Sequence, residues 1–238
     1  IVAHAAKQSS RPLKTFTVRF QGARVDESPL AQQVAERYET DHHLLEVSAS
    51  DVVQDLPKLA WFMEEPSNDA SVYPNYLIEQ VLGSHVRVAL NGTGGDELFA
   101  GYGRYFQTPI EQRYLAVPGI LRQHLIEPIT KIVNPQLAWK LARAQKFFDD
   151  GGAYLHEHTT FFSAHMRQRL QDNLKPVGYA QAAAYEAASG ERQSRALKVD
   201  IETYLPEDLL HLLDRTTMSA SVEGRVPFLN TALADAAL

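Results

Sequence analysis

The feature that most constrains the fold is a repeated change of character along the first 105 residues. Short segments rich in β-branched and aromatic residues alternate with segments whose apolar residues recur at helical spacing. The expected strands are Leu13 to Phe20, His43 to Val47 and Val86 to Leu90. Strands that alternate with helices indicate βαβ units, a parallel sheet and right-handed crossovers. A nucleotide-type α/β core over residues 1–105 is therefore predicted.

Helices are expected between these strands. Ser28 is predicted to be an N-cap, because Pro29 follows it at the first helical position. Ser50-Asp51 is predicted to cap the next helix, and Tyr73 to Leu82 has a helical pattern as well.

The pattern changes from about Phe106 onward, where helical spacing dominates and no clear strand follows Tyr105. The segment from Ser194 to Ser221 is predicted to be a long helical region interrupted at Pro206. We therefore expect a helical lobe over residues 106–238. Both chain ends have helical patterns without a cap or a terminating glycine, which suggests that segments are cut away there.

Composition narrows the function classes. The net charge of -6 over 238 residues argues against a nucleic-acid or anionic-membrane partner. The absence of cysteine excludes disulfides and thiolate metal sites, and it fits a reducing cytoplasm. No apolar run approaches the roughly 18 residues of a membrane span.

The segment from Val86 to Tyr105 carries the clearest chemical signal. A strand runs into the loop Asn91-Gly92-Thr93-Gly94-Gly95, and Asp96 then opens a helix. Glycines permit positive φ and close backbone approach to a ligand. Successive N–H groups beside a helix start can bind an anion, and a carboxylate there can hold Mg²⁺ beside a phosphate chain.

A second interpretation explains the same spacing. An ordinary tight turn between a strand and a helix, with Asp96 as the N-cap, needs no ligand at all. The loop is neither a GxxxxGK[ST] phosphate loop nor a convincing dinucleotide fingerprint. Spacing alone therefore indicates a possible phosphate site and leaves the two interpretations open.

Two longer motifs resemble the asparagine synthetase family. The first is GGDELFAGYGRY, from Gly94 to Tyr105, and the second is DRTTMSASVEGRVPFL, from Asp214 to Leu229. The acidic stretch from Glu65 to Ser71 and the segment from Val25 to His43 resemble the same family. The matches occur in the family's order and cover essentially the whole chain, which is similar to the C-terminal synthetase domain.

The resemblance implies a parallel twisted sheet of the adenine-nucleotide alpha-hydrolase-like (PP-loop ATP pyrophosphatase) type with an added helical lobe. It also implies the cofactors ATP and Mg²⁺, adenylation of a carboxylate such as aspartate, attack by ammonia, and an N-terminal glutaminase domain in the full-length chain. By similarity, the nucleotide-binding positions are Val18, Asn91, Gly92, Gly94 and Gly95, the metal-binding position is Asp96, and the catalytic positions are Asp96, Arg215 and Arg225, with Asp214 and Glu223 lining or bracing the site.

Departures from the family pattern qualify what is expected. The family usually has Ser-Gly-Glu where this chain has Asn91-Gly92-Thr93, so the acceptor could be aspartate or another carboxylate in a peptide, antibiotic or polysaccharide tailoring reaction. The family's SGGxDS loop would precede Ile1 and its catalytic lysine would follow Leu238. The 238 residues alone are expected to be inactive. A non-catalytic nucleotide-binding module is the alternative, and a homodimer is a possible assembly.

Overall fold

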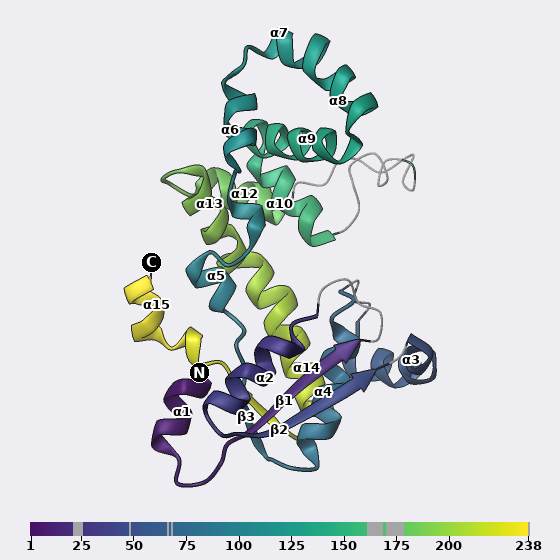
Figure 1. The fold of residues 1–238 in the computed structure, drawn as a ribbon, viewed down its shortest axis with the longest axis vertical. Helices are drawn as coiled ribbons and strands as arrows, with labels where there is room; N and C mark the ends of the chain where they lie inside the picture. The colour runs from purple at the N-terminus through teal and green to yellow at the C-terminus, as the bar shows by residue number, and fades with distance from the viewer. Residues whose placement is uncertain are drawn as a thin grey trace. The chain divides into compact units, whose positions relative to one another are not determined.

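A computed structural model describes residues 1–20, 26–47, 49–65, 67, 69–160, 169 and 179–237 (Figure 1). The chain forms two compact units. The first unit comprises residues 1–94 and 208–236, and the second comprises residues 95–207. These compact units divide the chain at other positions than the predicted boundary between the α/β core (1–105) and the helical lobe (106–238). That predicted boundary stays a prediction.

Two pairs of parallel strands form the sheets of the first unit. Strand β1 (Lys14–Phe20) pairs with β2 (Asp41–Val47), and β3 (Val88–Leu90) pairs with β4 (Glu223–Arg225). The three predicted strands are confirmed, and both strand pairs are parallel, but β3 pairs with β4 and not with β1 or β2, so the described residues form two small sheets in place of the one expected. The expectation of no strand after Tyr105 was wrong, because β4 follows it. Its sequence, Glu-Gly-Arg, has no β-branched or aromatic residue, so only its pairing with β3 makes it a strand.

Seven helical segments complete the described part of the first unit. They are α1 (Val2–Gln8), α2 (Ser28–Arg37), α3 (Ala49–Met63), α4 (Val72–Gly83), α14 (His211–Ser219), the 3₁₀ turn η4 (Pro227–Leu229) and α15 (Thr231–Ala237).

Two predicted helix starts are shifted by one or two residues. Glu27 is the N-cap of α2 and Ser28 is already helical, so Ser28 is not the cap. Ser50 and Asp51 lie inside α3 rather than before it. Helix boundaries of this kind are the least certain part of a sequence interpretation. Parts of two motifs, Val25, Pro66 and Asn68, lie outside the described residues.

The core of the first unit lies where α3, α4 and α14 pack with β2. Its buried members are Val47, Leu59, Met63, Val72, Tyr73, Tyr76 and Leu212. The buried positions of α4 recur at intervals of three or four residues, as expected for a helix with one face toward the core.

The described part of the second unit is helical. Its elements are α5 (Gly95–Phe99), η1 (Gly103–Tyr105), α6 (Pro109–Ala116), α7 (Gly119–Leu121), the π-helical η2 (Arg122–Ile126), α8 (Glu127–Val133), α9 (Pro135–Asp149), α10 (Gly151–Thr160), α12 (Ala180–Ala187) and α13 (Arg192–Val199). None of the described helices in either unit has the length and apolar character that crossing a bilayer requires.

The predicted interruption at Pro206 takes a specific form. Helix α13 continues directly into η3 (Asp200–Leu210), a π-helix that contains Pro206, and then into α14. Proline lacks an N–H and crowds the preceding turn of an α-helix. The wider π-helical turns remove that conflict without ending the helical path.

A buried ion pair anchors the core of the second unit. Asp200 has no exposed surface, and its Oδ2 atom accepts hydrogen bonds from Arg104 at 2.5 and 3.1 Å and from the hydroxyl of Tyr105. The aromatic rings of Tyr102 and Tyr204 lie 4.1 and 4.9 Å from the Arg104 guanidinium. The arginine is therefore paired and enclosed at once.

We predict that Asp200→Ala lowers the free energy of unfolding by about 3–5 kcal/mol, because it leaves the Arg104 charge buried without its partner. Equilibrium urea unfolding measures this. Glu202→Ala is the matched control, since the ion pair between Glu202 and Lys198 is exposed and should contribute less than about 1 kcal/mol. A loss for Asp200→Ala no larger than that of the control would contradict the prediction.

Candidate functional site

The loop after β3 is held by Asn91. Its backbone N–H donates to the carbonyl oxygen of Arg225 at 2.8 Å, which extends the ladder between β3 and β4 by one residue. Its side-chain Oδ1 accepts from both the N–H (2.8 Å) and the hydroxyl (2.7 Å) of Thr93. This Asx-type turn fixes the path of the backbone at the carboxyl end of a parallel strand, where α/β proteins bind ligands.

The two glycines of this loop differ in their surroundings. Gly92 is exposed, and a Cβ atom placed on it would meet no atom within 4 Å. Gly94 is buried and has φ of +90°, and a Cβ atom there would lie 2.4 Å from a methyl carbon of Leu229. Gly92 thus leaves the backbone open to a ligand, whereas Gly94 is required by the turn itself.

Asp96 lies in the first turn of α5, where its side chain is exposed. The helix ends one turn later, because Ala100 adopts φ of +56° and the N–H of Gly101 donates to the carbonyl of Asp96 at 2.9 Å. A Cβ atom on Gly101 would lie 1.8 Å from Oδ1 of Asp96. Gly101 therefore makes room for the Asp96 carboxylate, a role that the sequence interpretation missed although this glycine lies within the GGDELFAG motif.

The Asp96 carboxylate makes no hydrogen bond to any residue in the described part of the chain. Its hard oxygen atoms suit Mg²⁺, so its chemistry fits the predicted metal. Within the same described residues, no group of three or more His, Asp or Glu side chains could hold a metal ion. A magnesium ion at Asp96 would therefore need additional oxygen ligands from a phosphate chain and water, which is the usual arrangement for this ion.

The remaining predicted residues have other surroundings. Val18 is on β1 opposite Leu45, and its half-buried side chain packs against the core of the first unit. Arg225 is on β4, where its side chain is 61% exposed and its guanidinium donates to Glu223 at 2.7 Å. Arg225 thus contributes its backbone to the Asn91 loop and keeps its side chain in solvent.

Arg215 belongs to a different set of contacts. Its guanidinium lies 3.0 Å from Glu64, a residue with φ of +63° directly after α3. One turn earlier on α14, His211 lies 3.4 Å from Glu65. The structure therefore ties Arg215 to Glu64 at the end of α3.

Burial and the nearby Asp69 carboxylate raise the pKa of Asp208 to about 6. The neighbouring Asp214 is exposed.

A cavity of about 660 Å³ lies beside the loop within the first unit. Its wall includes Asn91 and Gly92 together with one edge of β1, one edge of β3 and faces of α1, α4 and α14. The strand residues that line it are Lys14, Thr15, Phe16, Val88, Ala89 and Leu90. In the described chain, β1 and β3 each have one strand partner, so each has one unpaired edge.

Glu79 also lines this cavity and was missed by the sequence interpretation. It is 2% exposed, and its Oε2 atom has no hydrogen-bond partner among the described residues. Burial raises the pKa of its carboxyl group to about 7. The available signal was its phase, since Glu79 falls three residues after the buried Tyr76 on the core-facing side of α4.

These observations describe an α/β unit with a glycine loop at the carboxyl end of a parallel strand, the general form of a ligand-binding α/β domain. The sequence model of the family described as asparagine synthase matches residues 1–238. The chain therefore belongs to the asparagine synthase family.

Individual relatives agree with this assignment. The chain is 27% identical over 241 residues to asparagine synthetase [glutamine-hydrolyzing] 1 of Bacillus subtilis. The matched region covers 99% of this chain and 38% of that protein. The chain is 30% identical over 244 residues to a protein of Mycobacterium bovis assigned as a glutamine-hydrolyzing asparagine synthetase, covering 97% of the chain and 35% of that protein. The chain thus spans little more than a third of the length of these relatives.

We predict that Gly94→Ala destabilises the protein by roughly 1–3 kcal/mol, because alanine is strained at φ of +90° and its methyl group would displace Leu229. Gly92→Ala is the matched control and should change stability by less than about 1 kcal/mol, since its Cβ atom enters open space. Thermal and urea unfolding of the two variants test the contrast. Equal losses would show that the loop has another backbone path.

Glu79 predicts a pH dependence of stability. Its folded-state pKa of about 7 lies above the usual value of 4.5, so the folded chain binds the proton more tightly than the unfolded chain does. The contribution of Glu79 to the free energy of unfolding is fully present below the pKa that Glu79 has in the unfolded chain. It is lost as the pH rises through the folded-state pKa of about 7. Relative to Glu79→Gln, the free energy of unfolding should fall by roughly 2–3 kcal/mol between pH 5 and pH 8. Parallel pH profiles for the two proteins would refute this.

Proposed function

We propose that this chain is the synthetase region of an ATP-dependent amide-forming ligase, in which the loop from Asn91 to Asp96 binds the phosphate chain of ATP. The observation that carries the proposal is the combination of an open backbone at Gly92, a positive φ at Gly94 and an exposed carboxylate at Asp96. Family membership supplies the reaction class, since the relatives are named as glutamine-hydrolyzing asparagine synthetases.

In the proposed site, the nucleotide lies along the carboxyl ends of the strands. Val18 contacts the adenine, while Asn91 and Gly92 contact the ATP molecule. Gly94 and Gly95 are the proposed phosphate-contacting positions: Gly94 sets the turn against Leu229, and Gly95 has no side chain of its own between its N–H group and the phosphates. Because the Asx-type turn already holds this loop, little conformational freedom is lost when the nucleotide binds.

Asp96 is the proposed protein ligand of Mg²⁺. When bound, the ion would neutralise part of the negative charge on the phosphate oxygens. Asp96 supplies a hard oxygen donor that is exposed and free of other hydrogen bonds among the described residues. The exposed guanidinium of Arg225 would need only to exchange one exposed partner, Glu223, to stabilise an anion. Arg215 would first have to leave Glu64, so we propose it as the less direct of the two.

The proposed chemistry has two balanced steps. A carboxylate oxygen of the substrate attacks the α-phosphorus of ATP, and the bond between that phosphorus and the bridging oxygen breaks to release pyrophosphate. The nitrogen of ammonia then attacks the carbonyl carbon, AMP leaves with the former carboxylate oxygen, and the nitrogen loses a proton. Preorganised N–H donors and cations at the departing pyrophosphate would stabilise the charge that develops there.

The finer fold type belongs to the same proposal. A strand placed between the unpaired edges of β1 and β3 would join the two sheets in the order β2-β1-new strand-β3-β4. In this arrangement the new strand connects through α1 to β1 on one side, and the chain later reaches β3 on its other side. The strand order then reverses at the new strand, which makes it a topological switch point. This is where the PP-loop type places its phosphate-binding SGGxDS loop, and the cavity between β1 and β3 supports the idea.

The substrate carboxylate and the ammonia source are further proposals. Aspartate is the acceptor that the family resemblance implies, but Thr93 has no carboxylate and its hydroxyl donates a hydrogen bond to Asn91. Another carboxylic acid is therefore an equal candidate. The longer relatives support a glutaminase domain elsewhere in the full-length protein. We also propose a cytoplasmic location.

We predict that the full-length protein releases pyrophosphate from ATP in the presence of one member of a panel of carboxylic acids that includes aspartate. Asp96→Ala should reduce this release by at least roughly 100-fold without changing the melting temperature, because it removes the metal ligand and no structural hydrogen bond. A coupled pyrophosphate assay with a defined ammonia supply gives both numbers.

Asp235→Ala is the matched control, an exposed aspartate on α15 outside the loop. It should keep the rate of the unmodified protein. Normal pyrophosphate release by Asp96→Ala would refute the role of Asp96. If the full-length protein binds ATP but releases no pyrophosphate with any acid, the chain is a non-catalytic nucleotide-binding module instead.

A further inference from the structure

Helix α5 carries Asp96 but is too short to hold that side chain in place by itself. It has five residues, and helices shorter than about 12 residues are marginal without tertiary contacts. Two of the five side chains are almost fully buried, with Glu97 at 1% and Leu98 at 5% exposure. The place of the Asp96 carboxylate therefore depends on the contacts that these buried residues make.

The two neighbouring acids of α5 have opposite surroundings. Successive side chains of an α-helix point about 100° apart, so Asp96 faces solvent while Glu97 faces the interior of the second unit. A buried carboxylate is costly unless it is hydrogen-bonded. The Oε1 atom of Glu97 accepts a hydrogen bond of 2.7 Å from the hydroxyl of Tyr102. This bond ties the interior side of α5 to a residue shortly beyond its end.

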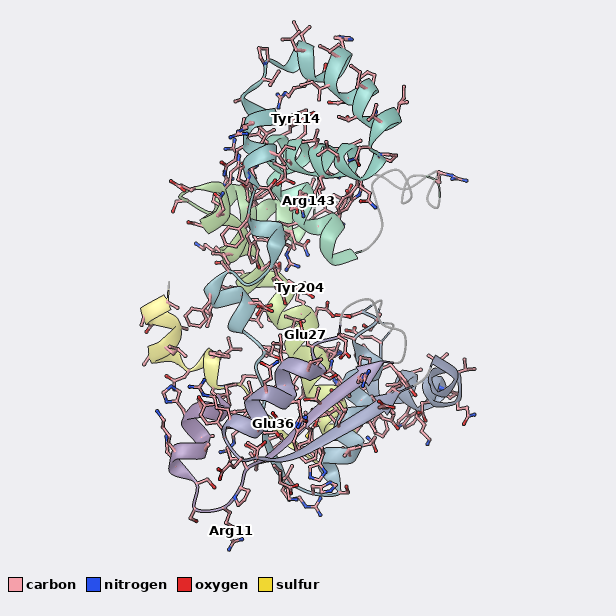
Figure 2. The ribbon with its side chains drawn as sticks, in the orientation of Figure 1. Arg11, Glu27, Glu36, Tyr114, Arg143 and Tyr204 are labelled. Carbon is pink, nitrogen blue, oxygen red and sulfur yellow. The ribbon has the colours of Figure 1, made fainter. Side chains whose placement is uncertain are left out.

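Tyr102 is itself held from two sides. Its ring lies 4.1 Å from the guanidinium of Arg104, whose charge is paired with Asp200 at the start of η3. It also lies 6.4 Å from the ring of Tyr204 on η3, in an edge-on arrangement (Tyr204 is labelled in Figure 2). The same ring packs against the buried core of the second unit. The hydroxyl of Tyr102 therefore connects α5 to a well-packed part of that unit.

We propose that Glu97 and Tyr102 form a positioning pair, which holds α5 so that Asp96 presents its carboxylate to Mg²⁺ in one fixed place. The inference rests on the proposed function, in which Asp96 is the protein ligand of the ion. A ligand that occupies its binding position for only part of the time lowers the affinity by that fraction. Residues that orient a metal ligand are for this reason part of a metal site.

The pair acts through the position of Asp96 and not through the charge of Glu97. A bound magnesium ion keeps several water ligands, so a residue that binds it directly must be open to solvent. Glu97 is 1% exposed, and its Oε1 atom is already used by Tyr102. Glu97 and Tyr102 are therefore positioning residues, and Asp96 is the residue that touches the ion.

Calorimetric titration of the full-length protein with ATP, repeated at a series of Mg²⁺ concentrations, tests the pair without relying on turnover. Tyr102→Phe keeps the ring beside Arg104 and removes only the hydroxyl. It should raise the Mg²⁺ concentration for half-maximal ATP binding by roughly 10-fold or more, the usual effect of losing a residue that orients a metal ligand. Glu97→Ala is a second loss variant and should give a shift of the same size.

Tyr114→Phe is the matched control. Tyr114 is another buried tyrosine of the second unit, and its hydroxyl donates to the carboxylate of Glu127 at 2.9 Å. Figure 2 shows Tyr114 toward one end of that unit, away from Tyr204. The control loses an equivalent hydrogen bond, so it should lower the melting temperature to a similar extent and leave the Mg²⁺ dependence unchanged. A shift as large as that of Tyr102→Phe would overturn the proposal, because the pair would then be an ordinary structural contact.

Glu97→Gln provides rescue by a conservative change. Its amide oxygen can still accept the hydrogen bond from Tyr102, so the Mg²⁺ dependence should shift by less than about 3-fold. A loss as large as that of Asp96→Ala would make Glu97 a direct metal ligand and overturn the proposal. So would a normal Mg²⁺ dependence in Tyr102→Phe.

Asp96→Ala separates the failure of this inference from the failure of the proposed function. If Asp96→Ala abolishes the Mg²⁺ dependence of ATP binding and Tyr102→Phe leaves it normal, only the positioning pair is refuted. If the unmodified protein does not bind ATP, or if Asp96→Ala keeps the full Mg²⁺ dependence, the proposed function of the loop is refuted and the pair is refuted with it.

Discussion

The pairing of β3 with β4 is the contact on which the first unit depends. It joins Val88–Leu90 to Glu223–Arg225, and the whole second unit lies between them in the sequence. Closing so long a loop carries an entropic cost that three ladder residues offset only with help from surrounding packing. Helix α14 provides that packing through Leu213 and Thr217, whose side chains lie beside Gly224 of β4. The same ladder continues into Asn91, so the geometry of the candidate site follows from it.

Local sequence patterns predicted the parts of the first unit that have strong local signals. The β-branched and aromatic runs marked β1, β2 and β3, and the helical spacing marked α4 within one residue of its observed start. Strand β4 could not be predicted, because Glu223, Gly224 and Arg225 have no strand propensity and acquire their conformation from β3. The helix starts at Ser28 and Ser50 were displaced for a related reason, since a residue with a good capping side chain need not be the residue that caps.

In the candidate site, too, features with a local sequence signal were predicted and features that depend on tertiary contacts were not. Glycine spacing and the family motifs predicted a bent backbone after β3, and the positive φ of Gly94 agrees with that prediction. They did not predict which glycine is open and which lies under Leu229, because that depends on a residue 135 positions later. The role of Gly101 beside Asp96 and the burial of Glu79 were missed, since both depend on tertiary contacts. Site assignments for Arg215 and Val18 remain predictions carried by resemblance.

The turn between Asn91 and Thr93 has a consequence for how this loop can change over evolutionary time. One amide oxygen accepts two hydrogen bonds from Thr93, so neither residue contributes independently of the other. Exchanging Thr93 for glutamate alone would remove the hydroxyl donor, and exchanging Asn91 for serine alone would leave a shorter acceptor that holds Thr93 more weakly. A lineage passing between Asn-Gly-Thr and Ser-Gly-Glu would therefore cross a less ordered intermediate whichever position mutates first. Such coupling tends to preserve a loop in one of two forms, and related chains should carry matched pairs far more often than mixed ones.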